Sequence, residues 1–168
     1  FAPVKGISTT VQCWWFLTVD DPSGRGPSHL LVATGDGLFS IDRDRAIPIL
    51  ESVAGSFQPA VLYRSKRNTS RVFVGLFDGL ASLRLDAGKW VFEGRVEGVS
   101  DEVRSIVEDI DGQLWLGTAA GGILRVDVVS PLQAGPGPAL PPNPRVERFG
   151  AAHGLPPTGV SVSWAGGK

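Results

Sequence analysis

The sequence predicts an all-β fold built from four-stranded antiparallel units that repeat along the chain. Three observations predict it: short apolar runs alternate with Gly-containing turns, one turn pattern recurs about every 43 residues, and helical periodicity does not persist anywhere. A short strand between two turns buries too little surface to be stable alone. Each apolar run must therefore belong to a larger sheet.

The recurring turn is a glycine followed by a branched aliphatic residue. It occurs at Gly37-Leu38, Gly79-Leu80 and Gly122-Ile123, so the spacing is 42 and then 43 residues. Each pair follows an apolar run: HLLVA, RVFVG and QLWLG in chain order. A second landmark is a glycine that leads into a strand at the start of each unit, and it is found at Gly6, Gly55, Gly98 and Gly154.

The first unit covers residues 6–54. Its apolar runs predict strands at residues 10–19, 30–33, 38–42 and 47–50. A polar insertion at residues 20–28 lengthens the connection between the first two strands.

The second unit covers residues 55–97 and follows the same order. Its expected strands are residues 60–64, 72–75, 80–85 and 89–94.

The third unit covers residues 98–153, and residues 154–168 begin another. Its expected strands are residues 103–108, 114–117, 122–127 and 145–149. Asp111-Gly112 predicts a tight hairpin between the first two, because these residue types accept the positive φ that such a turn requires. The proline-rich insertion at residues 131–144 is expected to be a solvent loop, since proline cannot donate to a strand ladder.

Four-stranded units of this length that repeat in series are typical of β-propeller blades. Propellers usually close with 4 to 8 blades, so three blades and the start of a fourth predict a fragment of a larger ring. The chain lacks methionine, which also indicates an excised or processed piece. We expect its two open edges to pair with the remaining blades or with another copy.

The third unit resembles the two-component regulator propeller repeat. The resemblance rests on "VEDIDGQLWLGTAAGGILRVD" followed by "GLPP". The landmark residues are Asp109, Asp111, Gly112, Trp115, Gly117, Thr118, Gly121, Gly122, Ile123, Asp127, Gly154, Leu155 and Pro156. The first two units depart from this pattern, with Leu31 and Phe73 in place of Trp115, Ala33 in place of Gly117, and no Asp-Gly hairpin.

The resemblance implies a non-enzymatic sensor region in the bacterial periplasm. Such propellers belong to two-component histidine kinases, or sometimes to diguanylate cyclases, whose catalytic domains lie elsewhere in the receptor. The landmark residues are interpreted as structural: Trp115 is expected to pack between blades, Gly117 and Gly122 to allow close backbone turns, and Asp109 or Asp127 to cap a turn.

Composition argues against several other functions. The 16 basic and 17 acidic side chains give a net charge of -1, which does not favour binding to nucleic acid, and no apolar stretch is long enough for a membrane helix. The two histidines lie far apart in the sequence, so no metal site is expected, and no motif indicates a cofactor. The single cysteine, Cys13, cannot form an internal disulfide.

A ligand site, if present, is expected on the loops that gather at one end of the ring. The polar or aromatic residues of these loops that do not belong to the repeat are Asp36, Phe77, Asp78, Asp101 and Glu102. Their hydrogen-bonding and stacking groups suit a sugar-like molecule. Two alternatives remain open at this point: a propeller enzyme that cleaves polysaccharides, and a scaffold for protein partners.

Overall fold

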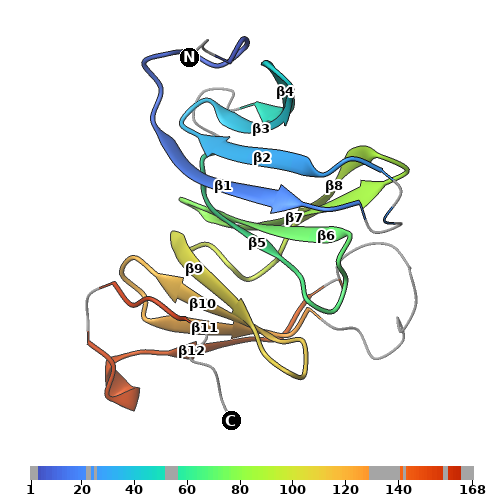
Figure 1. Cartoon of the computed structure of the whole chain (residues 1–168). Helices are drawn as coiled ribbons and strands as arrows, with labels where there is room; N and C mark the ends of the chain where they lie inside the picture. Colours follow the sequence, from blue (N-terminus) through green and yellow to red (C-terminus); the bar gives the residue numbers. More distant parts are fainter. Residues whose placement is uncertain are drawn as a thin grey trace.

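Three four-stranded antiparallel sheets make up the structure (Figure 1), and we call them blades 1, 2 and 3. The computed structural model describes residues 4–21, 24, 26–51, 57–128, 141, 143–156 and 159–163, apart from the side chain of Glu51. In each blade, strands that follow one another in the chain are neighbours in the sheet. The prediction of an all-β fold made of propeller-like blades is confirmed, and the three sheets do not close into a ring.

The strands lie in or next to the ranges expected from the sequence. Blade 1 contains β1 (Cys13–Val19), β2 (His29–Thr34), β3 (Gly37–Asp42) and β4 (Arg45–Glu51). Blade 2 contains β5 (Pro59–Arg64), β6 (Arg71–Leu76), β7 (Gly79–Asp86) and β8 (Lys89–Arg95). Blade 3 contains β9 (Val103–Glu108), β10 (Leu114–Thr118), β11 (Ile123–Val126) and β12 (Val146–Phe149), and the 3-10 helix η1 (Ala151–His153) follows it.

The first strands of the three blades lie side by side. β1 contacts β5, β5 contacts β9, and the remaining strands of each blade follow outward from them (Figure 1). The second strands β2 and β6 also contact the first strand of the next blade. This arrangement is the one that blades adopt around a propeller axis.

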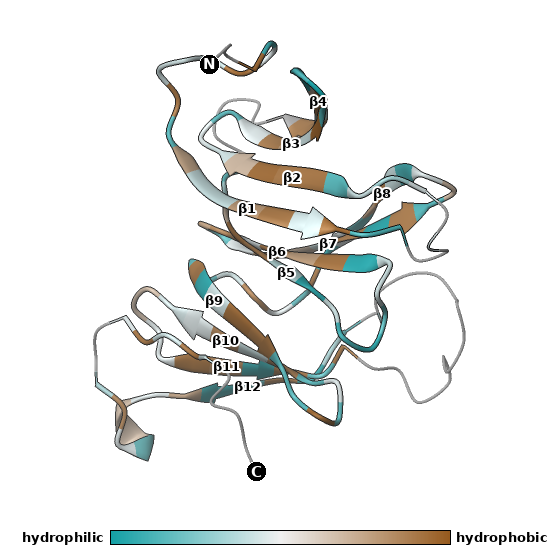
Figure 2. Cartoon of the chain, in the orientation of Figure 1, coloured by the Kyte–Doolittle hydropathy of each residue, from teal (hydrophilic) through white to brown (hydrophobic). Residues whose placement is uncertain are grey.

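Two apolar layers fill the spaces between the blades. Successive residues of a strand point to opposite faces, so β6 sends Val72 and Val74 into the layer shared with blade 1 and Phe73 into the layer shared with blade 3. Leu114 and Leu116 of β10 face Phe73 across the second layer. Apolar residues therefore run along the strands of all three blades (Figure 2). Blade 2 is covered on both faces by its neighbours.

Gly117 in β10 allows the chain after blade 3 to approach closely. A Cβ atom at this position would lie 2.2 Å from the carbonyl oxygen of Val160. The segment 159–163 is held there by hydrogen bonds from the Val160 amide to the Thr118 carbonyl (3.1 Å) and from the Val162 amide to Ser105 Oγ (2.9 Å). Residues 154–168 were expected to begin a fourth blade, which stays a prediction; the described residues 159–163 lie along blade 3 and are not part of a strand.

Glu108, at the end of β9, joins blade 3 to blade 2. Its carboxylate accepts hydrogen bonds from the Ser65 hydroxyl (2.9 Å) and from the Lys66 and Arg67 amides in the β5–β6 turn. The Glu108 amide in turn donates to the Tyr63 hydroxyl (3.2 Å). Burial raises the pKa of the Tyr63 phenol, and the nearby Glu108 charge acts in the same direction. Glu108 is buried, so these donors replace the water that its charge would otherwise need.

Two further expectations bear on parts of the chain outside the blades. The expected loop at residues 131–144 lies largely outside the described residues. Within the described part of the chain, none of the helices has the length and apolar character needed to span a membrane.

Replacing Glu108 with Gln should lower the free energy of unfolding by about 1–3 kcal/mol, because the new NH2 group would face donors and leave buried amides unpaired. Urea unfolding of the Glu108→Gln variant measures this loss. Glu97→Gln, an identical change at an exposed turn position, is the control and should alter stability by less than about 0.5 kcal/mol. Equal stability of the two variants would contradict the role assigned to Glu108.

Candidate functional site

The loops expected to bind a ligand lie at one end of the three blades. All three sheets have the same strand order and their first strands lie side by side, so equivalent turns meet at the same end. The β2–β3 and β10–β11 turns lie on the left in Figure 1. We call this end the axial face and define it by residues 35–36, 77–78, 96–102 and 119–122.

Two of the predicted carboxylates on the axial face are bound by arginines. Asp78 accepts two hydrogen bonds from Arg95 Nη2 (3.0 and 3.1 Å). Asp101 accepts hydrogen bonds from Arg148 Nη1 (2.9 Å) and Nη2 (2.7 Å). Arg95 lies opposite Ala81 in blade 2 and Arg148 lies opposite Leu124 in blade 3, so the two arginines hold equivalent positions on β8 and β12. Each fastens an axial loop to the fourth strand of its blade.

The third paired carboxylate, Glu102, interacts with Arg104 of β9, whose Nε donates to it over 2.9 Å. Phe77 packs edge-on against Trp14 of β1, with ring centroids 5.8 Å apart. Asp36 is exposed, and its amide donates to Thr34 Oγ1 (3.2 Å). Among the residues that the structure describes, Asp36 is thus the predicted axial carboxylate without an arginine partner.

These ion pairs limit what the axial carboxylates can do chemically. The hydrogen bonds from Arg148 hold the pKa of Asp101 below its usual value, although partial burial acts in the opposite direction. Asp101 is therefore ionised and engaged at neutral pH. A ligand that bound there would have to displace Arg148, so the arrangement favours a loop-organising role for this carboxylate.

Asp109 and Trp115 form the centre of the framework in blade 3. Asp109 Oδ2 accepts a hydrogen bond from Trp115 Nε1 (2.8 Å), and its Oδ1 accepts from the amides of Asp111 (3.0 Å) and Gln113 (2.9 Å). Although partial burial raises it, these hydrogen bonds hold the pKa of Asp109 below its usual value. Asp109 thus closes the turn around Gly112, whose positive φ of 84° suits glycine.

Trp115 was expected to pack between blades, which stays a prediction; among the described residues its partners lie in blade 3. Its ring stacks on Phe149 at 5.6 Å, and the Arg125 guanidinium lies 5.6 Å from the ring centroid. Its strand neighbours Leu114 and Leu116 face blade 2, so Trp115 lies on the opposite face. Phe73, its equivalent in blade 2, is buried against the next blade.

The remaining framework residues hold the turns between second and third strands. The Thr118 hydroxyl donates to the Gly122 carbonyl (2.9 Å), and the Thr34 hydroxyl donates to the Gly37 carbonyl (3.1 Å) at the equivalent turn of blade 1. Gly79 begins β7, where a Cβ atom would lie 2.8 Å from the Val99 carbonyl oxygen. The Asp127 amide donates to the Arg145 carbonyl (2.9 Å) beyond β11.

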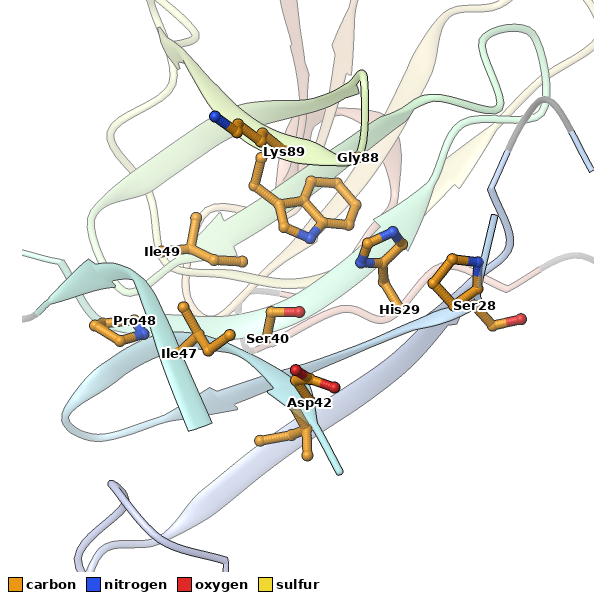
Figure 3. A pocket seen from close by; sticks show the side chains of 12 residues that line it. Ser28, His29, Ser40, Asp42, Ile47, Pro48, Ile49, Gly88 and Lys89 are labelled. Carbon is orange, nitrogen blue, oxygen red and sulfur yellow. The ribbon is translucent and has the colours of Figure 1, made fainter. Parts of the chain in front are cut away.

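A cleft that sequence reasoning missed lies between the outer strands of blade 1 and the β7–β8 hairpin of blade 2 (Figure 3). Its volume is about 500 Å³, within the range of small-molecule sites. Its polar lining comes from His29, Ser40, Asp42 and Lys89, and its apolar lining comes mainly from Ile47, Ile49 and Trp90. In Figure 3, Lys89 and Asp42 lie on opposite sides, with His29, Ser40 and Ile49 between them.

Two nitrogen atoms at this cleft have no hydrogen-bond partner in the described part of the chain. His29 Nε2 and Trp90 Nε1 are buried, and no described group pairs with either atom. The two rings meet edge to face with centroids 5.8 Å apart. The indole N–H is a donor only, so it requires an acceptor. The sequence analysis considered His29 only as a metal ligand. A comparison of equivalent positions in blades 1 and 2 could have pointed to the cleft.

A metal site finds no support in the part of the chain that the structure describes, where no three His, Cys, Asp or Glu side chains gather as ligands. His153 packs against Phe149 with ring centroids 5.3 Å apart, and its Nδ1 accepts a hydrogen bond from the Gly150 amide. His29 lies in the cleft, in blade 1.

Comparison with known proteins identifies the repeat. Residues 97–120 match the family model described as two component regulator propeller. The match covers β9, β10 and the hairpin between them, including Asp109, Trp115 and Gly117. It confirms the resemblance inferred from these residues. No curated protein and no solved structure matches the chain significantly.

Asp109→Asn should lower the free energy of unfolding by about 1 kcal/mol or more at pH 7, since charge-assisted hydrogen bonds are lost. The folded-state pKa of Asp109 lies below the ordinary 3.8, so its contribution is complete above that value and is lost as pH falls through the folded-state pKa. The difference from the unmodified chain should therefore shrink in acid. Chemical unfolding at a series of pH values measures it.

Asp111→Asn is the matched control, because Asp111 is exposed in the same turn. A stability difference for Asp109→Asn that stays constant down to strong acid would contradict the assignment of the charge.

Proposed function

We propose that this chain is part of a ligand-sensing propeller, a non-enzymatic region of a bacterial two-component receptor that lies in the periplasm. The observation that carries the proposal is the match of residues 97–120 to the two component regulator propeller family. The three blades built on the same strand order support it. A histidine kinase or diguanylate cyclase activity would belong to other parts of the receptor.

Sensing by a propeller needs a ligand that binds one packing of the blades better than another. Such a ligand shifts the population of the two arrangements, and the size of the shift is limited by its difference in affinity. The joints between blades are suitable places, because loops and side chains from two blades meet there. The cleft between blades 1 and 2 and the loops of the axial face both have this property.

The pairing of the axial carboxylates favours binding over catalysis. Acid–base catalysis by two carboxyl groups requires that they be free to exchange protons with a substrate. Asp78, Asp101 and Glu102 each interact with an arginine. Their charges are used to position loops, which is what a rigid recognition surface requires.

The partner of the open blade faces is proposed to be a further blade, either from the rest of the receptor or from a second copy. On the face of blade 1 that points away from blade 2, Phe16 of β1 and Leu30 of β2 are 72% and 36% exposed. Exposed large apolar side chains on an uncovered sheet face mark an interaction surface. At the other end of the chain, Trp115 occupies a blade 3 position whose equivalent in blade 2, Phe73, is buried against the next blade.

A sensor should be stabilised by its ligand and should release the ligand without chemical conversion. Thermal unfolding of the chain against a panel of oligosaccharides and small organic acids should reveal a compound that raises the Tm, with a gain of about 2.7 kcal/mol at about 100 times its Kd. Mass spectrometry of the recovered compound should show no conversion. Conversion would indicate an enzyme, and stabilisation by protein partners alone would indicate a scaffold.

The open faces predict association in solution. Light scattering should give a mass above the 17.8 kDa of one chain, rising with concentration. Phe16→Ser should weaken this association, because it removes the most exposed aromatic ring of β1. Ile110→Ser, at a turn residue that is 85% exposed, is the control and should not change it. A mass of one chain at every concentration would refute the proposal.

A further inference from the structure

The joint between blades 2 and 3 contains a carboxylate that fills a polar pocket. Glu93 of β8 has a side chain that is only 3% exposed. It accepts hydrogen bonds from Arg71 Nε (2.8 Å), Arg71 Nη2 (3.0 Å) and the Ser82 hydroxyl (2.6 Å). Arg84 Nε lies 3.5 Å from Glu93 Oε1, at ion-pair distance but without a hydrogen bond. The blade therefore supplies its own anion to this cluster of donors.

The same positions in blade 1 carry other side chains. The strand registers align His29 with Arg71, Ser40 with Ser82 and Asp42 with Arg84. Ser40 lies opposite Ile47 of the fourth strand, and the neighbouring lining of β4 is Pro48 and Ile49. None of these three residues carries a carboxylate. The cleft of about 500 Å³ occupies the place in blade 1 that is equivalent to the ion cluster of blade 2.

We propose that this cleft binds a small organic acid, whose carboxylate takes the place that Glu93 occupies in blade 2. The Ser40 hydroxyl corresponds to the Ser82 hydroxyl that donates to Glu93. His29 Nε2 and Trp90 Nε1, buried and without a partner among the described residues, supply the further donors. A carboxylate accepts several hydrogen bonds at once, so it satisfies all three groups.

The other residues that line the cleft determine which group can be attached to the carboxylate. Ile47, Pro48 and Ile49 form an apolar wall, which fits a hydrocarbon or aromatic body attached to the carboxylate. Lys89 on the hairpin adds a positive charge that attracts an anion. Asp42 adds a negative charge that opposes it, and both side chains are exposed, so each acts through solvent as a moderate effect.

Entry of the ligand requires a small movement of the β7–β8 hairpin. His29 Nε2 and Trp90 Nε1 are buried and have no partner among the described residues, and the two rings are in edge-to-face contact. A carboxylate that separates the rings gives each nitrogen the partner that it lacks. Binding would thus change the joint between blades 1 and 2. The inference rests on the proposed sensing role, because it names the ligand class and the place of binding.

The indole N–H of Trp90 reports this binding directly. In the 15N-labelled chain, each tryptophan gives one indole N–H resonance in an NMR spectrum, and Trp90→Phe assigns that of Trp90. Addition of phenylacetate or hexanoate at millimolar concentration should move this resonance downfield in a saturable way. Phenylacetamide, which has the same shape without the charge, and phenethylamine should leave it in place.

Substitutions in the cleft should change the affinity for phenylacetate in opposite directions. Ser40→Ala and Lys89→Gln should each weaken phenylacetate binding by about twofold to fivefold, whereas Asp42→Asn should strengthen it by a similar factor. Arg104→Gln removes an equal charge from blade 3 and should have no effect. Ile47→Glu should restore an internal carboxylate and abolish binding, while Ile47→Gln, its neutral counterpart, should reduce binding less.

Several results would overturn the inference. These are a Trp90 resonance that does not move with either acid, equal binding of phenylacetamide, or weaker binding by Asp42→Asn. The results that would refute the proposed function differ from those that would refute the cleft. A compound that stabilises the chain while the cleft variants bind it normally would refute the cleft and leave the sensing role standing, whereas chemical conversion of a bound acid would refute the sensing role and leave the cleft.

Discussion

Each four-stranded blade has two apolar faces, and only another blade can cover them. This constraint explains why β5 lies between β1 and β9 and why β6 sends alternate side chains to opposite neighbours. It also explains Gly75 in β6, where a Cβ atom would lie 2.9 Å from the Val103 side chain of blade 3, since sheets that bury each other must approach closely near the axis. The hydrogen bonds of Glu108 then fix how blade 3 sits against blade 2.

Two groups of residues can be distinguished in the repeat. One group holds the strands and turns of a blade together, and the other lies between two neighbouring blades. Asp109, Trp115 and Thr118 act within blade 3 to close turns and support strands. The positions of Arg71, Ser82 and Arg84 face a joint; blade 1 keeps the serine as Ser40, but His29 and Asp42 stand in place of the two arginines. Blade 2 uses them to hold Glu93, and blade 1 uses them to line a cleft. Specific recognition belongs to such positions, because they can vary while the framework stays the same.

Sequence patterns predicted the strands well because each blade is a local structure. Gly37, Gly79 and Gly122 mark turns between neighbouring strands, and apolar runs supply the strands. The partners of the axial carboxylates were not predictable in this way. Asp101 and Arg148 are separated by 47 residues and meet only through the sheet register. His29 and Trp90 come from different blades, so the cleft depends on how two sheets pack, which no local pattern encodes.

The ion cluster around Glu93 has a consequence for how such repeats diversify. In blade 1 the fourth strand has no acidic residue at the place of Glu93, the serine donor is kept as Ser40, and a space lies beside it. The strand ladder and turns need not change, because the replaced side chain makes no backbone hydrogen bond of its own. The same backbone positions can therefore hold a sealed ion cluster in one blade and line an open cleft in another.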